Sequence, residues 1–207
     1  MFFTRSILAL FLGLMSSLAV ADSSGPLGID HRLNFDDAAL WSSGNLKAVE
    51  YGSALLVLGG ALYEGNESRL GKTFWKTVDA MLLGDVSAAA AKVLFRRQRP
   101  IDGNDPGAFF KSSSDDSFPS GSMTHITAIV TPFILEYQKE TPSVWLLAAL
   151  PAYVGIAKLK TQEHWQTDIL AGAALGVGVG YFATRHDSAW SAHVLPAGFS
   201  VGYKKSF

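Results

Sequence analysis

The sequence has 207 residues, of which 48% are hydrophobic and 17% are charged, with a formal net charge of -1 and a mean hydropathy of +0.20. The balanced charge excludes a broad basic surface for nucleic acid, although it leaves room for a small basic cluster inside a pocket. The absence of cysteine excludes disulfide bonds, so the fold must be stabilised by packing.

The first 21 residues have the layout of a secretory signal peptide. Arg5 precedes an apolar run over residues 7–14, and the small-residue triplet Ala19-Val20-Ala21 follows. We expect cleavage after Ala21 and therefore an exported, periplasmic protein. An N-terminal membrane anchor is the alternative, but the apolar run is short for a membrane span.

The rest of the chain has the pattern of a single helical domain, residues 48–207, after a polar and irregular lead-in over residues 22–47. Apolar segments of helical length recur along the domain, and the only strand pattern lies in its tail. The segments that we expect to form helices are residues 48–63, 74–97, 122–138, 143–159 and 167–184. The expected fold is therefore an all-α helical bundle of about five to six core helices.

The stretches of the domain without charged residues indicate whether a helix could span a membrane. The longest are residues 117–135, 141–157 and 169–184, and each is interrupted by Pro, Gly, Ser or His. A spanning helix needs about 20 mostly apolar residues. We therefore favour helices buried in a soluble bundle, with peripheral membrane contact as an option, over an integral membrane protein.

Two further features concern packing. Gly172, Gly176 and Gly180 recur every four residues in the last apolar segment, which predicts a helix face that another helix approaches closely. The loop over residues 101–116 carries adjacent rings, Phe109 and Phe110. We expect these rings to pin the loop to the core, although they could also contact the apolar part of a substrate.

The first cluster of charged residues is the stretch KVLFRRQRP. Lys92 and Arg99 are seven residues apart in it, which corresponds to two helical turns and predicts that both point from one face of a helix that Pro100 ends. Taken alone, such a pair is more typical of a solvated, basic helix end.

The second cluster is Pro119-Ser120-Gly121-Ser122, which precedes an apolar helix. The unpaired backbone N–H groups and the positive dipole end at such a helix start suit an anion such as phosphate. Ordinary helix capping by Ser120 accounts for the same residues.

In the third cluster, Lys158, His164 and Asp168 are spaced six and four residues apart. Asp168 is close enough to hold one ring nitrogen of His164, which would orient the other nitrogen towards a substrate. Alternatively, Asp168 only caps a helix and His164 is a loop residue. A metal site made of His164, Asp168 and Glu163 fits known ligand spacings poorly.

Taken together and in this order, the three clusters resemble the signature of the type 2 phosphatidic acid phosphatase superfamily, which includes bacterial class A acid phosphatases and vanadium haloperoxidases. The resemblance covers roughly residues 48–184, and the run HWQTDILAGAALG is especially similar to the third motif of the family and its following helix. It implies an acid phosphatase/vanadium-haloperoxidase-like helical bundle with one phosphate pocket, no metal or other cofactor, and vanadate as an inhibitor.

The resemblance also implies a role for each matching residue. His164 would be the nucleophile, transiently phosphorylated, and Asp168 would be its orienting partner. The residues that would hold the phosphoryl oxygens are Lys92, Arg99, Ser120, Gly121 and Lys158.

Two positions depart from the family pattern. The family has Pro-Ser-Gly-His in the second motif, but Ser122 stands in place of this histidine and cannot donate a proton to a leaving group near neutral pH. Our hypothesis is that His125, one helical turn further on, takes over this role; the alternative is that it only packs in the helix. Lys158 stands in place of an arginine and lacks its bidentate fork.

The sequence therefore predicts a metal-independent phosphatase that hydrolyses a lipid phosphate or a small phosphomonoester through a phosphohistidine intermediate. The alternative, for which Ser122 is the argument, is a catalytically silent relative that binds an anionic headgroup or supports an envelope assembly. A vanadate-dependent haloperoxidase would use the same pocket, but nothing in the sequence indicates halide chemistry. No nucleic acid partner is expected.

Overall fold

The computed structural model describes residues 24–186, 188, 190–195 and 198–203, so the predicted signal peptide, residues 1–21, lies outside the described residues. The helices are η2 (Ala39–Trp41), α2 (Ser43–Glu64), α3 (Arg69–Phe95), α4 (Gly121–Tyr137), η3 (Pro142–Ala148), α5 (Ala149–Lys160) and α6 (Gln166–Thr184). Strands β1 (Trp190–Leu195) and β2 (Gly198–Tyr203) form an antiparallel hairpin. The predicted all-α bundle is confirmed, with this hairpin added after α6.

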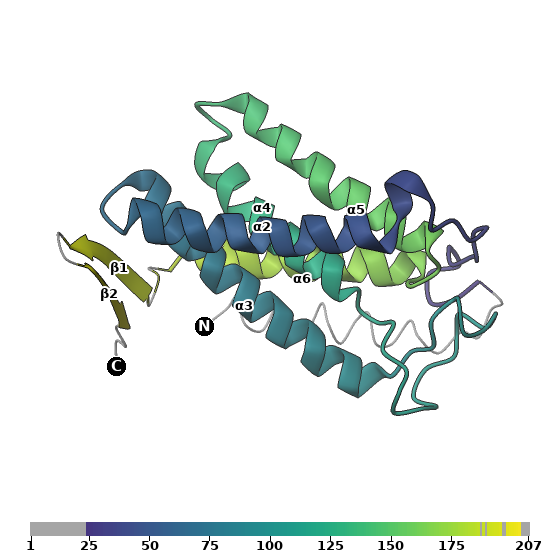
Figure 1. The fold of residues 1–207 in the computed structure, drawn as a ribbon. Coiled ribbons are helices and arrows are strands. Elements are labelled where there is room, and N and C mark those ends of the chain that lie inside the picture. The colour runs from purple at the N-terminus through teal and green to yellow at the C-terminus, as the bar shows by residue number, and fades with distance from the viewer. Residues whose placement is uncertain (1–23, 187, 189, 196–197, 204–207) are drawn as a thin grey trace.

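Helix α4 occupies the centre of the bundle, where it packs against α2, α3, α5 and α6. Figure 1 shows the hairpin at one end of the bundle and the long loop between α3 and α4 at the other. The main core cluster comes from α2, α3 and α4 and comprises Val57, Ala61, Trp75, Val78, Met81, Ile129, Val130 and Ile134. The core thus holds together α3 and α4, whose ends carry the first two motifs.

The glycine face of α6 packs directly on α4, as predicted. A Cβ atom on Gly172 would lie 2.5 Å from the carbonyl oxygen of Ser120, and one on Gly176 would lie 2.6 Å from that of Thr124. Real Cβ atoms do not come so close to a backbone atom. The glycines therefore allow α6 to lie against the backbone of α4.

Two helices begin earlier than predicted because serine side chains cap them. The Ser42 hydroxyl accepts the N–H of Asn45 at 3.3 Å, so α2 starts at residue 43. The Ser68 hydroxyl accepts the N–H of Gly71 at 2.9 Å, so α3 starts at residue 69 within the segment that we expected to be a connection. The expected helix over residues 143–159 is divided between η3 and α5.

The prediction that Pro100 ends the first motif helix is wrong. Helix α3 ends at Phe95, because Arg96 adopts a left-handed conformation with φ of 42° and its N–H bonds to the carbonyl of Lys92. Lys92 therefore lies in the last helical turn, whereas Arg99 lies in the loop. The two residues do not share a helix face.

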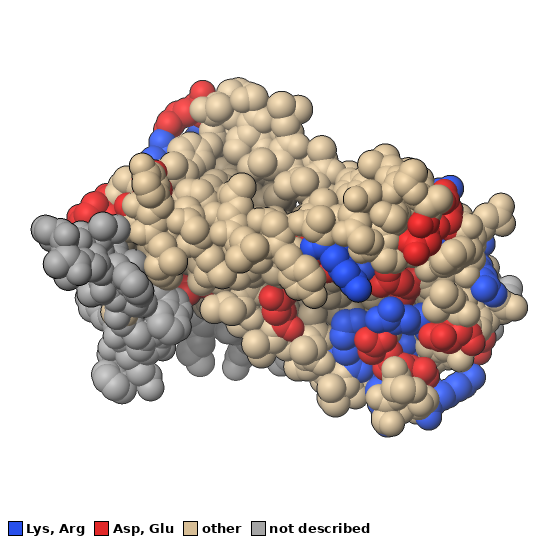
Figure 2. All heavy atoms as spheres, in the orientation of Figure 1, with Lys and Arg blue, Asp and Glu red and all other residues tan. Residues whose placement is uncertain are grey.

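The outer faces of the helices expose many apolar side chains. Among the described residues, two segments are long and apolar enough to cross a membrane, Pro142–Lys160 and Gln166–Thr184, and only 28% and 39% of their most apolar stretches are buried. Figure 2 shows a middle region with few charged side chains between two ends that carry most of them. These helices are therefore less buried than we expected for a soluble bundle.

Candidate active site

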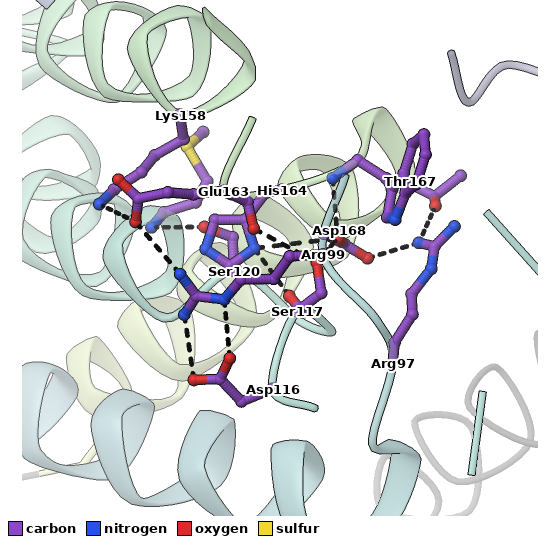
Figure 3. A network of polar contacts seen from close by, with 12 residues as sticks. Arg97, Arg99, Asp116, Ser117, Ser120, Lys158, Glu163, His164, Thr167 and Asp168 are labelled. Carbon is purple, nitrogen blue, oxygen red and sulfur yellow. Dashed lines mark hydrogen bonds and ion pairs between the residues drawn. The ribbon is translucent and has the colours of Figure 1, made fainter. Parts of the chain in front are cut away.

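The three motifs meet at the end of the bundle that holds the loop between α3 and α4 (Figure 3). Lys92 and Lys158 lie in the last turns of α3 and α5, Ser120 caps α4, and Asp168 lies in the first turn of α6. Arg99 and His164 come from the loops before α4 and α6.

Asp116 joins the two basic residues of the first motif. Its carboxylate accepts two hydrogen bonds from Arg99, at 2.7 Å from Nε and 3.0 Å from Nη2. Lys92 Nζ donates to the Asp116 carbonyl and lies 3.9 Å from a carboxylate oxygen. Burial raises the pKa of Asp116, but the Arg99 hydrogen bond and the two positive charges outweigh it, so the pKa is lowered. Lys92 and Arg99 therefore converge although they lie on different elements.

Glu163 similarly pairs with the basic residue of the third motif. Lys158 Nζ lies 2.9 Å from Glu163 Oε2 and 3.6 Å from Glu50 Oε1, and Arg99 Nη1 lies 3.6 Å from Glu163 Oε2. Burial raises the pKa of Glu163, but the charge and hydrogen bond of Lys158 outweigh it, so the pKa is lowered. Carboxylates thus balance the cationic groups in the site.

His164 is almost fully buried and has a defined tautomer. Its Nδ1 lies 2.7 Å from the carbonyl oxygen of Ser117. Because a carbonyl only accepts hydrogen bonds, Nδ1 carries the proton in the neutral ring and Nε2 keeps a lone pair. Burial, the largest influence, lowers the pKa of His164 below its ordinary value, and Asp168 offsets this only in part. The geometry thus presents a neutral imidazole with a nucleophilic Nε2.

Asp168 supports the histidine in several ways at once. One carboxylate oxygen accepts from the Ser117 hydroxyl at 2.5 Å and from the Trp165 N–H at 2.8 Å, and it lies 3.8 Å from His164 Nδ1. The other accepts from Arg97 at 2.5 Å. Asp168 therefore both caps the first turn of α6 and holds Ser117, whose carbonyl orients His164. The capping alternative and the orienting role are compatible.

The start of α4 provides the remaining predicted phosphate contacts. The buried Ser120 hydroxyl accepts the Met123 N–H at 3.4 Å, and the Ser120 N–H donates to the Asp168 carbonyl. A Cβ on Gly121 would lie 3.5 Å from Lys92 Cε, so the lysine side chain passes the helix start. Because the first N–H groups of a helix have no partner within it, those of Gly121 and Ser122 can bind an anion.

His125 lies one turn further along α4 and faces α3. Its Nδ1 lies 3.0 Å from both carboxylate oxygens of Asp85, and its Nε2 is buried without a hydrogen-bond partner among the described residues. Since Gly121 contacts Lys92 and His125 contacts Asp85, α3 and α4 run antiparallel. His125 therefore lies deeper along the α3–α4 contact than the basic residues, and its proposed proton-donor role stays a prediction.

The aromatic residues of the long loop pin it, as expected. Phe109 lies 6.5 Å from Phe95 and 6.0 Å from Phe118, measured between ring centroids. The Arg97 guanidinium lies 4.7 Å above the Phe109 ring. Phe110 completes the cluster but is about half exposed.

Several residues of the site were not identified from the sequence. Asp116 and Ser117 lie within three residues of the second motif, and Arg97 lies inside the first, so proximity to a motif is the signal that could have found them. Asp30 lies in the lead-in, 67 residues from its partner Arg97. No sequence pattern connects Asp30 with the site.

The fold and the site together define a helical bundle in which basic side chains, paired with carboxylates, gather near a buried histidine. The PAP2 superfamily model matches residues 74–191, more than half of the chain, and the chain belongs to this superfamily. The resemblance inferred from the sequence is therefore confirmed.

Two relatives are similar to the chain. It is 32% identical over 130 residues to the lipid A 1-phosphatase of Porphyromonas gingivalis; the match covers 61% of this chain but only 26% of that protein. The crystal structure of Aquifex aeolicus LpxE is similar with a TM-score of 0.50 and 18% identity, covering 68% of this chain and 84% of that chain. The similarity to Aquifex aeolicus LpxE shows a shared fold.

Proposed function

We propose that this protein is a metal-independent phosphatase that hydrolyses the phosphate monoester of a membrane lipid through a phosphohistidine at His164. The observation that carries the proposal is the convergence of Lys92, Arg99 and the α4 start on a neutral imidazole whose Nε2 keeps its lone pair. The similarity to a lipid A 1-phosphatase supports a lipid phosphate as the substrate.

The proposed reaction has two displacements at phosphorus. His164 Nε2 attacks the phosphorus atom, so that the N–P bond forms while the bond to the leaving oxygen breaks and that oxygen takes a proton from His125. Water then attacks the phosphorus and gives a proton back to His125, the N–P bond breaks, and inorganic phosphate leaves. Lys92, Arg99, Lys158 and the α4 N–H groups neutralise the charge on the phosphoryl oxygens, which is the main requirement of phosphoryl transfer.

The surface of the bundle supports a membrane-bound position for the enzyme. The exposed apolar side chains of α2 include Tyr51, Leu55, Leu56, Leu62 and Tyr63. Figure 2 shows the region with few charged side chains beside the charged end that carries the site. This arrangement would place the site at the level of lipid headgroups in the exported location that we propose.

A catalytically silent relative that binds an anionic headgroup is the second candidate. Ser122 in place of the family histidine favours it, and so does the pairing of Arg99 and Lys158 with carboxylates, which an incoming phosphate must compete with. A protein of this kind would bind phosphate groups without turning them over.

The test is hydrolysis by purified full-length protein in detergent, with p-nitrophenyl phosphate and a lipid phosphate as substrates. We expect hydrolysis that persists in EDTA, is inhibited by vanadate and falls to background in His164→Ala. The matched control is His186→Ala, because His186 is an exposed histidine just after α6, near the hairpin. An acid-labile, base-stable phosphoenzyme should be trapped only when His164 is present.

Two results would count against the proposal. Full activity in His164→Ala would exclude the phosphohistidine. Absence of hydrolysis of both esters, combined with phosphate-dependent binding of the lipid, would favour the silent relative.

A further inference from the structure

Arg97 is fully buried beside the proposed active site and uses its whole hydrogen-bonding capacity. A guanidinium has five N–H donors. Nη1 donates to Thr167 Oγ1 at 2.7 Å and to Asp168 Oδ1 at 2.5 Å, and Nε and Nη2 both donate to the Pro106 carbonyl. The fifth bond, from Nη2, goes to Asp30 Oδ2 at 2.7 Å. Lysine could not make this set of contacts.

Asp30 reaches this position from the lead-in, which belongs to none of the three motifs. Its two carboxylate oxygens accept from the Thr167 N–H at 2.8 Å and from the Thr167 hydroxyl at 2.7 Å. Its backbone N–H bonds to the Ser24 carbonyl, which closes a turn through Gly25. A Cβ on Gly25 would lie 2.2 Å from Asp30 Oδ2, so this turn requires glycine.

The charges of the buried cluster explain why both residues are needed. Arg97 holds Asp168 in place, but its positive charge cancels the negative charge of that carboxylate. Asp30 restores a net charge of about -1 to the buried group of Arg97, Asp30 and Asp168, all three essentially inaccessible to solvent. A net negative cluster favours the positive charge that develops on the imidazole when His164 attacks phosphorus.

We propose that Arg97 and Asp30 are positioning residues for His164 that act through Asp168, so that the lead-in completes the catalytic centre. This inference rests on the proposed function. Arg97 sets the location of the Asp168 carboxylate, and Asp30 sets the net charge behind the imidazole. Neither residue touches the substrate.

The other charged groups around His164 are the same in every variant considered below. They are Lys92 from α3, Arg99 and Asp116 from the loop before α4, Lys158 from α5 and Glu163 from the loop before α6.

The test compares the full-length protein with Asp30→Asn and with the double variant Asp30→Asn/Arg97→Gln, using the pH dependence of p-nitrophenyl phosphate hydrolysis. In Asp30→Asn the buried cluster becomes neutral. The acidic limb of the pH–rate profile, where the rate falls as His164 takes up a proton, should therefore move about one pH unit lower. We also expect kcat to fall about tenfold, with KM nearly unchanged. The double variant regains the net charge. Its acidic limb should return to the wild-type position while kcat stays low, because Asp168 has lost its clamp.

Arg32→Gln provides the matched control on the same segment. Arg32 ties the lead-in to Gln162 at 2.9 Å and to Asn104 at 2.7 Å, without contact with the buried cluster. This variant should keep the wild-type acidic limb and kcat. Thermal unfolding of all variants separates loss of fold from loss of positioning.

A ¹⁵N NMR titration of the His164 ring provides the same comparison without turnover, so failure of the proposed function does not obscure the result. The inference is overturned if Asp30→Asn leaves both the acidic limb and the ring titration unchanged. It is also overturned if Arg32→Gln shifts them by the same amount, because a loosened lead-in would then explain both.

Discussion

The hydrogen bond between His164 Nδ1 and a backbone carbonyl is the residue-scale feature with the clearest consequence for rate. A carbonyl cannot stabilise an imidazolium as a free carboxylate does, and Asp168 lies beyond hydrogen-bond distance at 3.8 Å. Burial, together with the charges of Lys92 and Arg99, therefore lowers the pKa of His164. The His164 ring therefore takes up a proton at a lower pH than an ordinary histidine.

The lowered pKa of His164 predicts the pH at which the rate falls on the acidic side of the pH–rate profile. The neutral ring attacks phosphorus, so kcat/KM should stay level as the pH falls through 6.5, the ordinary pKa of histidine, and decline only at lower pH. Hydrolysis of p-nitrophenyl phosphate across this range, with the ionisation of the substrate measured separately, checks the prediction. A limb centred at or above 6.5 would contradict it.

His125 supplies the second residue-scale prediction. It lies one helical turn, about 6 Å, beyond the α4 start, where it could reach a leaving oxygen that extends along α3 and α4, and Asp85 orients its ring. His125→Ala should slow hydrolysis of an alkyl phosphate by about 100-fold and that of p-nitrophenyl phosphate much less, because nitrophenolate needs little protonation. Asp85→Asn should show the same preference with a smaller effect.

The two substrates serve as mutual controls in this comparison. Full turnover of the alkyl phosphate by His125→Ala would show that the histidine only packs in the helix.

At the scale of elements, the contact between α4 and α6 links stability to the site. Ser120, whose carbonyl meets Gly172, also caps α4 and bonds to the Asp168 backbone. Movement of α6 away from α4 would therefore change the distance between the helix start and the nucleophile loop.

Gly172→Ala tests this link. The added Cβ would clash with the Ser120 carbonyl, so we expect a loss of about 1 to 3 kcal/mol in unfolding free energy and a clear loss of turnover. Gly178→Ala is the matched control on the same helix, since a Cβ there meets no atom within 4 Å. It should leave turnover unchanged and, if anything, stabilise the helix. Thermal unfolding and p-nitrophenyl phosphate hydrolysis measure the two effects. Equal behaviour of the two variants would disprove the link.

At the scale of the whole molecule, exposed apolar side chains and charged side chains occupy different parts of the bundle surface. Apolar side chains are exposed in the middle region, and charged residues gather at the ends (Figure 2). An exposed apolar surface of this extent is typical of contact with a membrane or another protein.

Vesicle flotation tests the membrane contact. Leu55 and Leu62 on α2 are 70% and 44% exposed, so Leu55→Glu/Leu62→Glu should strongly reduce the fraction of protein that floats with phospholipid vesicles, because a charge in the lipid interior is unfavourable. Lys111→Glu, an exposed change in the long loop, should have little effect. Flotation of the double leucine variant at the wild-type level would show that this face does not contact lipid.

Much of the fold and half of the site could be predicted from the sequence, because the relevant signals are local. Helical periodicity, glycine spacing and motif spacing each operate within about 20 residues. They predicted the bundle and a close helix contact at the glycine face, and the resemblance of the motifs to a known family supplied the candidates Lys92, Arg99, His164 and Asp168. Local signals also misplaced an element boundary. Helix α3 ends before Arg99 because Arg96 adopts a left-handed conformation. No residue type in that stretch indicates this conformation.

What the sequence by itself determined is the set of reactive groups and the helices that carry them. Only the tertiary structure decided how those groups are held: the Ser117 carbonyl bonds to a histidine 47 residues away, and Asp30 bonds to Thr167 across 137 residues. Such contacts form when folding brings distant segments together, and their geometry depends on packing of the whole core. For this reason the proposed nucleophile could be inferred from the sequence, whereas its tautomer and its supporting charges could not.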